Sequence, residues 1–234
     1  MKAMRLHAIV RLEQESAPLA LDEVAEPEPG PGEILIEVTS CGVCHTELDE
    51  IEGRTPPQQL PVILGHQIVG RVRGHGEGAG QFQIGDLVGV AWIHSACGRC
   101  HFCRSGRENL CPDFVATGRD VDGGYAEYTK LPEKFAHALP DALDPRKVAP
   151  LLCAGAIGYR SLRLCKVEDG CRLGLTGFGA SARLVLKLAQ ALYPRAEFFV
   201  FARSQREREF AAELGAHWTG TSDERTPVPL DAII

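Results

Sequence analysis

The stretch Arg172-Leu-Gly-Leu-Thr-Gly177-Phe-Gly179-Ala-Ser-Ala182 decides the fold of this chain. Its first five residues have the apolar character of a buried strand, and residues 180–192 have a helical pattern. Glycine in the turn between them lets the backbone close tightly and approach a pyrophosphate at the start of the helix. The motif predicts a dinucleotide-binding turn, and a plain tight turn between strand and helix is the alternative.

The sequence after this stretch continues to alternate between strand and helix. Residues 197–202 predict a strand, residues 205–214 a helix with a charged face, and residues 227–234 another buried strand. Such alternation is typical of a doubly wound parallel sheet, which normally continues through about six strands. We therefore expect the first half of such a sheet, with the chain stopping inside it.

The sequence before this stretch has a different pattern of apolar residues. Residues 4–139 form short runs rich in valine, isoleucine and leucine, separated by glycine and proline clusters, and this pattern predicts a compact β unit. The expected strands include residues 34–40, 62–66, 68–72 and 86–92. Asp144 and Pro145 fit the cap and first position of a helix, and residues 149–164 are predicted to be helical as well.

Four cysteines follow one another closely with the spacing C-x2-C-x2-C-x7-C: Cys97, Cys100, Cys103 and Cys111. Four thiolates that leave no coordination position of the zinc open make a structural site. Such a site would stabilise a loop that is poor in apolar residues. An iron–sulfur cluster is an alternative, because some ferredoxin spacings also contain C-x2-C-x2-C. Four unrelated cysteines are the other alternative.

Residues 41–47 bring thiols, an imidazole and a hydroxyl to the end of a predicted strand. The sequence there is Cys41-Gly-Val-Cys44-His45-Thr46-Glu47, which has the appearance of half of a metal site. The C-x-x-C spacing is also open to a redox pair, although no thioredoxin-like strand context surrounds it. His66 and Cys153, each taken alone, have the character of ordinary buried residues.

The end of the second strand of the α/β region bears on the choice of cofactor. An NAD site would have a carboxylate there, but the sequence is Phe201-Ala202-Arg203-Ser204. Arg203 and Ser204 are suited to hold a 2′-phosphate, which favours NADP over NAD. The alternative is that these residues are simply the solvent-exposed, basic start of the next helix.

Composition and charge exclude some classes of protein. The formal charge of −6 and the absence of a basic block make nucleic acid a poor partner. No run approaches the roughly 18 apolar residues that a membrane span needs. Nine cysteines without an export signal indicate a reducing compartment in which thiols bind metals. We expect a cytoplasmic protein that binds neither nucleic acid nor a membrane.

As a set, these residues resemble the zinc-dependent alcohol dehydrogenases of the medium-chain dehydrogenase/reductase family. The resemblance rests on the four-cysteine spacing, the glycine turn and the segments Cys44-His-Thr46, Gly65-His66, Gly85-Asp86-x-Val88, Asp122-Gly-Gly-Tyr-Ala-Glu-Tyr128 and Leu151-Leu-Cys-Ala-Gly155. It implies an α/β plus β fold with two domains. A GroES-like β domain would occupy residues 1–150, with a zinc lobe at about 94–114, and an incomplete Rossmann-type sheet would occupy residues 151–234.

The resemblance assigns the metal ligands. Cys44, His66 and Cys153 would hold a catalytic zinc and leave its fourth position for water or substrate, whereas Cys41 is no ligand. The cysteines of the lobe, Cys97, Cys100, Cys103 and Cys111, would hold a second, structural zinc. Two residues depart from the family near the catalytic metal. Glu47 replaces the usual aspartate behind a zinc-ligand histidine, and Gln67 replaces a glutamate, which we hypothesise keeps the zinc a stronger Lewis acid.

The resemblance also assigns the cofactor and substrate contacts. The cofactor would lie against His45 and the turn residues Gly177, Gly179 and Ala182, with Arg203 and Ser204 at its ribose. Thr46 would accept the hydroxyl proton of the alcohol while a hydride passes to nicotinamide. Trp92 would narrow the pocket for small primary alcohols, and ordinary core packing is its alternative role.

The function that the resemblance implies is the interconversion of primary alcohols and aldehydes by hydride transfer to or from NAD(P). Full-length relatives continue for roughly another hundred residues and are expected to be homo-oligomers. A catalytically silent zinc-binding fragment of such an enzyme is the alternative, because the nicotinamide half of the cofactor site would be largely absent.

Overall fold

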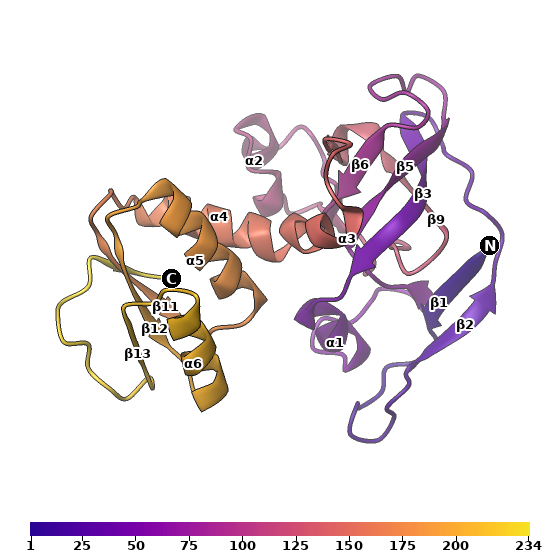
Figure 1. Ribbon diagram of the computed structural model, residues 1–234. Coiled ribbons are helices and arrows are strands. Elements are labelled where there is room, and N and C mark those ends of the chain that lie inside the picture. Colours follow the sequence, from indigo (N-terminus) through magenta and orange to yellow (C-terminus); the bar gives the residue numbers. More distant parts are fainter. The chain divides into compact units, whose positions relative to one another are not determined.

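The structure is a computed structural model that describes residues 1–234. The chain divides into two compact units, Met1–Cys153 and Ala154–Ile234 (Figure 1). The division falls three residues after the predicted domain boundary. None of the helices combines the length and the apolar character needed to cross a membrane.

The first unit is built around a five-stranded antiparallel sheet with the strand order β10-β6-β5-β3-β9. The strands are β3 (Glu33–Gly42), β5 (Gln67–His75), β6 (Leu87–Val90), β9 (Tyr128–Pro132) and β10 (Ala136–Ala138). β3 and β5 lie side by side in the middle of the sheet (Figure 1). Their inward side chains form a buried cluster that includes Ile34, Ile36 and Ile68. The predicted β unit is therefore confirmed.

A second sheet in the first unit has the order β2-β1-β4. Its strands are β1 (Lys2–Leu6), β2 (Leu19–Glu23) and β4 (Val62–Ile63). A small pair joins β7 (Ile93–Ser95) to β8 (Val115–Ala116). The remaining elements are short: α1 (His45–Ile51), α2 (His101–Arg104), η1 (Glu108–Leu110), η2 (Glu133–Phe135), α3 (Pro145–Val148) and η3 (Ala149–Leu152).

Two sequence predictions need correction. The strand predicted at residues 62–66 is only the two residues of β4, because the chain turns through Gly65 at a φ of +97° before His66. The continuous helix predicted at residues 149–164 is interrupted at Cys153, whose backbone leaves the helical region at φ −128° and ψ −78°. The first turn is the 3₁₀-helix η3, and the regular helix α4 (Ala154–Cys165) begins after the break.

The second unit holds a four-stranded parallel sheet with the order β13-β12-β11-β14. Its elements after α4 are β11 (Arg172–Thr176), α5 (Ala180–Leu192), β12 (Glu197–Phe201), α6 (Gln205–Glu213), β13 (Trp218–Gly220) and β14 (Ala232–Ile233). The strand expected near the end of the sequence is β14, which pairs with β11. The alternation of strand and helix and the parallel sheet are as predicted.

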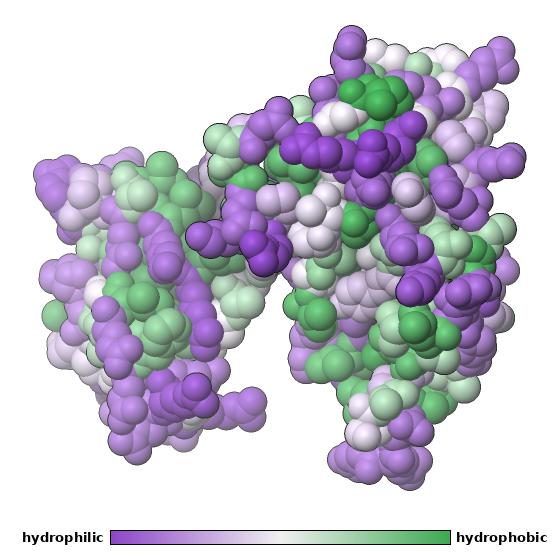
Figure 2. All heavy atoms as spheres, turned by 45° about the vertical axis from the view of Figure 1, so that its right-hand side comes forward, coloured by the Kyte–Doolittle hydropathy of each residue, from purple (hydrophilic) through white to green (hydrophobic).

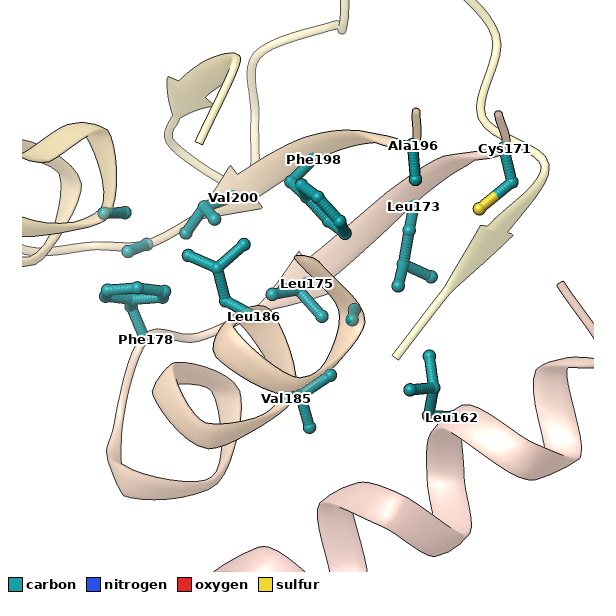
Figure 3. Close-up of a cluster of buried hydrophobic side chains, with 13 residues drawn as sticks. Leu162, Cys171, Leu173, Leu175, Phe178, Val185, Leu186, Ala196, Phe198 and Val200 are labelled. Carbon is teal, nitrogen blue, oxygen red and sulfur yellow. The ribbon is translucent and has the colours of Figure 1, made fainter. Parts of the chain in front are cut away.

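The core of the second unit lies between this sheet and its helices. Figure 3 shows Leu186 on α5 pointing toward Leu175 and Val200 of the sheet. All three side chains are at most 1% exposed. Apolar side chains also remain on the surface of both units (Figure 2), and those on α4 include Ile157, Tyr159 and Leu164.

Shortening Leu186 to alanine is expected to destabilise the second unit by about 2–5 kcal/mol, because it removes buried methyl groups and leaves a cavity. Leu192→Ala on the same helix is the matched control, since Leu192 is 49% exposed and should change stability by less than about 0.5 kcal/mol. Denaturant unfolding of both variants measures the difference. Equal losses in the two variants would contradict the placement of this core.

Candidate metal centres

Three potential ligands from distant parts of the sequence meet in the first unit. Cys44 follows β3 and is the N-cap of α1, His66 immediately precedes β5, and Cys153 lies at the break before α4. Their ligand atoms all lie within 4.8 Å of one another. We call them the three-ligand group. Cys41, the other half of the C-x-x-C pair, is not a member.

The spacing of the three-ligand group fits a zinc ion. The sulfurs of Cys44 and Cys153 are 3.8 Å apart, far beyond the length of a disulfide bond. Two thiolates bound to one tetrahedral zinc at about 2.3 Å would have their sulfurs about 3.8 Å apart. Nε2 of His66 is buried without a hydrogen-bond partner, so a donor atom is free for a metal. Two sulfurs and one imidazole are ligands that zinc prefers.

Charge in the three-ligand group is distributed unevenly. A hydrogen bond from Cys153 and the neighbouring imidazole of His66 lower the pKa of the Cys44 thiol to about 3. The same hydrogen bond to Cys44 raises the pKa of Cys153 well above its usual range. Burial lowers the pKa of His66, but its interactions with the neighbouring Cys44 and Glu47 outweigh burial and raise it to about 9. Without a metal, these shifts favour a thiolate on Cys44 and a proton on His66, and a bound metal would displace that proton.

Glu47 connects two of these ligands. Its Oε1 is 2.6 Å from Nδ1 of His66, and its Oε2 accepts a hydrogen bond of 2.7 Å from the backbone N–H of Cys44. Because Glu47 is the third residue of α1, the second contact completes a capping box at the start of the helix. The first contact fixes the ring orientation of His66, which leaves Nε2 to face the two sulfurs.

The other residues predicted near this centre have different surroundings. Oγ1 of Thr46 is 3.5 Å from the sulfur of Cys44. The ring of Trp92 meets the ring of His66 edge to face, with centroids 5.1 Å apart. Gln67 is only 3% exposed. By contrast, the side chain of His45 is 76% exposed and lies 3.8 Å from Asp49.

Glu50 is a buried residue of this region that the sequence analysis missed. It is 0% exposed, and neither of its carboxylate oxygens has a hydrogen-bond partner. Burial, and next the charge of Glu47, raise the pKa of Glu50 to about 8. The three-residue spacing from Glu47 was the available signal, because it places both carboxylates on one face of α1.

Glu50 should make stability depend on pH. Its folded pKa of about 8 lies above the ordinary value of 4.5, so the folded state loses stability as pH rises from about 4.5 through 8. The neutral Glu50→Gln variant avoids this loss. Its free energy of unfolding minus that of the parent should therefore be larger at pH 8.5 than at pH 5, by a few kcal/mol. Denaturant unfolding at both pH values measures this, with the exposed Glu23→Gln as control. A pH-independent difference for Glu50→Gln would be the contrary result.

A second group contains the four cysteines of the lobe, and their ligand atoms also lie within 4.8 Å of one another: Cys97, Cys100, Cys103 and Cys111. The sulfur of Cys103 is 3.5 Å from that of Cys100 and 3.9 Å from that of Cys97. Cys100 caps α2, and its sulfur accepts a hydrogen bond from the N–H of Cys103. Such spacings fit four thiolates around one tetrahedral ion. We call these residues the four-cysteine group.

The glycine turn lies in the second unit, between β11 and α5. Gly177 has a φ of +79°, a conformation that favours glycine, and its N–H donates to the carbonyl of Phe201 at 2.7 Å. Gly179 caps α5, with open space where a side chain would be. Ala182 lies in the first turn of α5 and is half-buried.

Arg203 and Ser204 directly follow β12, and both are exposed. Arg208 holds this turn by donating hydrogen bonds of 2.7 and 2.8 Å to the carbonyls of Ala202 and Arg203. The structure therefore places the predicted cofactor residues of the second unit at the carboxyl ends of two neighbouring parallel strands, whereas His45 lies on α1 of the first unit. This edge of an open sheet is where α/β proteins bind ligands.

Comparison with known proteins agrees with this arrangement. Residues 30–141 match the alcohol dehydrogenase GroES-like domain family. The chain is 47% identical over 225 residues to a probable alcohol dehydrogenase, AdhA, of Mycobacterium tuberculosis, and 94% of the chain is covered. It is 41% identical over 175 residues, 74% of its length, to an alcohol dehydrogenase of Geobacillus stearothermophilus. The chain belongs to the zinc-dependent alcohol dehydrogenase family.

Solved structures of alcohol dehydrogenases and related enzymes share the fold. A cobalt- and zinc-bound thermostable alcohol dehydrogenase from Pyrobaculum aerophilum is 27% identical with a TM-score of 0.87, and the match covers 100% of this chain and 69% of that one. A CAD from Helicobacter pylori complexed with NADP(H) is 28% identical with a TM-score of 0.88, with 99% and 67% covered. The predicted family and fold class are confirmed.

This member of the zinc-dependent alcohol dehydrogenase family is shorter than the relatives it matches. It spans 64% of the length of the M. tuberculosis relative and 52% of that of the G. stearothermophilus relative. The GroES-like match lies wholly within the first unit, which contains both groups of potential metal ligands.

Proposed function

We propose that this protein is a zinc-dependent oxidoreductase that interconverts primary alcohols and aldehydes by hydride transfer to or from NAD(P). The observation that carries the proposal is the three-ligand group, in which two sulfurs and a free imidazole nitrogen converge beside a hydroxyl group. Three protein ligands that leave a fourth position open are typical of a catalytic zinc, whereas four thiolates are typical of a structural one.

In this proposal Cys44, His66 and Cys153 hold the catalytic zinc. Bound there, the ion would supply Lewis acidity to the oxygen of the alcohol or aldehyde. Glu47 holds the imidazole of His66 in the orientation that binds metal. The four-cysteine group holds a second zinc, which fixes the lobe and takes no part in the chemistry.

Thr46 is proposed to move the proton. Its Oγ1 lies beside the sulfur of Cys44, so a hydroxyl group bound near the metal comes within reach of it. The threonine hydroxyl can accept the substrate's proton while it donates its own to water, and this exchange leaves no charge on the side chain. Trp92, in edge-to-face contact with His66, forms an apolar wall that favours small alcohols.

We further propose that NADP is preferred over NAD, with the pyrophosphate on the turn of Gly177, Gly179 and Ala182. Support comes from the absence of a carboxylate after β12 and from the exposed Arg203 and Ser204 at that position. His45 is proposed to contact the pyrophosphate, and its exposed side chain is free to do so. The nine unpaired thiols support a reducing, cytoplasmic setting. A homo-oligomer is proposed by analogy with the relatives.

Turnover of Thr46→Ala tests the proposed function. The unmutated chain should bind two zinc ions, one for each ligand group, and should reduce NADP with ethanol or benzyl alcohol. Thr46→Ala should keep both ions and lose about 100-fold or more in kcat, because a positioned proton acceptor contributes 10²–10⁴-fold. Zinc analysis and cofactor absorbance measure the two quantities.

The matched control for this experiment is Thr55→Ala, which removes an exposed hydroxyl group outside the site. It should leave zinc content and turnover unchanged. A parent chain that carries both ions and turns over neither alcohol would contradict the proposal and would favour a silent zinc-binding fragment.

A further inference from the structure

Trp92 is held beside the metal ligands by its main chain. It lies between β6 and β7, and its carbonyl accepts a hydrogen bond of 2.9 Å from the N–H of Thr117. The indole meets the ring of His66 at an interplanar angle of 83°, a favourable edge-to-face contact. The main-chain bond fixes the position of Trp92 but leaves the rotation of its side chain open, so the indole needs a second contact.

Arg119 makes this second contact with the indole of Trp92. Its guanidinium carbon is 5.4 Å from the centroid of the Trp92 ring and 5.5 Å from that of Phe114. The cation therefore contacts two aromatic rings, and each contact is attractive at this distance. Arginine is suited to this role because its planar group stacks on aromatic faces, whereas the compact ammonium of lysine does not.

Asp120 fixes the plane of Arg119. Nε of Arg119 donates to Oδ1 of Asp120 at 2.9 Å and Nη2 donates to Oδ2 at 2.8 Å, which is a bidentate pair. Oδ2 also accepts a hydrogen bond of 2.8 Å from the N–H of Ala116. The side chain of Asp120 is 4% exposed and that of Arg119 is 22% exposed. The guanidinium is thus anchored on a largely buried carboxylate that is itself tied to β8.

We propose that Arg119 is a positioning residue that holds the indole of Trp92 against His66 and thereby limits the size of the alcohol that reaches the metal. This inference rests on the proposed function. Arg119 touches neither the three-ligand group nor the substrate in this arrangement, and it acts only through Trp92. Without it the indole can rotate away and open space for a bulkier alcohol.

Trp92 fluorescence tests the first half of the proposal without requiring turnover. The chain contains two tryptophans, so a Trp218→Phe background leaves Trp92 as the sole reporter. In that background Arg119→Leu should raise the acrylamide quenching constant of Trp92 about twofold or more, because the indole becomes exposed and mobile. Arg119→Lys keeps the charge next to Asp120 and should give an intermediate increase.

Substrate selectivity tests the second half. The ratio of kcat/KM for benzyl alcohol to that for ethanol should rise by about 3- to 30-fold in Arg119→Leu and by less in Arg119→Lys, as expected for the loss of a partly buried cation–π contact. Zinc content should stay at the parent level. The matched control is Arg163→Lys, whose guanidinium lies 5.8 Å from the ring of Tyr159 in the second unit. It should change neither quenching nor selectivity.

Each result decides the proposal. Unchanged quenching in both Arg119 variants would overturn it even if selectivity shifted, because Arg119 would then act by another route. Increased quenching with unchanged selectivity would overturn the size limit. If Arg119→Leu does not fold, the same two measurements on Arg119→Lys decide the proposal. If the parent turns over neither alcohol, the proposed function fails, whereas quenching still decides whether Arg119 holds the indole.

Discussion

Cys153→Ser is expected to abolish alcohol turnover and to lower the zinc content from two ions to one per chain. Cys153 supplies one of the two sulfurs of the three-ligand group. A serine hydroxyl is a poor zinc ligand, and the loss of partners that only orient a ligand already costs 10–100-fold in metal affinity. Loss of a direct ligand should therefore weaken binding by more than about 100-fold. Metal analysis after dialysis measures the content, and cofactor absorbance measures turnover.

Cys41→Ser is the matched control for Cys153→Ser. Cys41 lies three residues before Cys44 and is outside both ligand groups, and burial raises the pKa of its thiol to about 12. The control should keep two ions and most of the turnover. Retention of both ions by Cys153→Ser would show that the three-ligand group is not the catalytic metal site.

Cys103→Ala is expected to unfold the lobe. The four-cysteine group lies in residues 97–111, where Cys111, itself one of the four ligands, is the only buried residue. Structural zinc in such segments contributes about 10–16 kcal/mol of binding free energy that exists only in the folded state. Loss of one of four ligands should therefore cost several kcal/mol and leave residues 97–111 without fixed structure. The ion of the three-ligand group should remain.

Limited trypsin digestion measures this effect directly, because the lobe contains Arg99, Arg104 and Arg107. Cys103→Ala should be cut there at enzyme concentrations that leave the parent intact, and its zinc content should fall to one ion. The control is Cys165→Ala, which removes a half-buried cysteine outside both groups. A trypsin-resistant Cys103→Ala with two ions would refute a metal-stabilised lobe.

The two ligand groups differ in how far local sequence could predict them. The four cysteines lie close together in the chain, so their spacing alone indicated one ion, and the structure brings their four sulfurs within 4.8 Å of one another. The three-ligand group joins residues that are 22 and 87 positions apart. No local pattern links such residues. Only the family resemblance placed Cys44, His66 and Cys153 together.

The break at Cys153 shows the limit of local helix propensity. Residues 149–164 contain small and apolar residues that permit one continuous helix. In the structure the backbone leaves the helical region at Cys153, and its sulfur lies 3.8 Å from that of Cys44. A regular helix would fix the direction of this side chain by its own geometry. The site thus overrides propensity at one residue, which no local pattern could reveal.

The side-chain contacts around the site could not be predicted from the sequence either. Trp92 was predicted in the substrate pocket, but the contacts of Arg119 with Trp92, Phe114 and Asp120 depend on how two loops meet. Glu50 lies on α1, and groups far from it in the sequence, His66 and Arg119, lie near it in the fold. By contrast, the glycine turn and the strands on either side were predictable, because glycine spacing and apolar runs are local signals.

The double contact of Glu47 restricts how this site can change during evolution. One carboxylate serves both the start of α1 and the ring of His66. A substitution at residue 47 must therefore preserve two acceptors at once, or be accompanied by changes at Cys44 and His66. Mutations at these three positions should be strongly epistatic, with double variants far from the sum of the single ones.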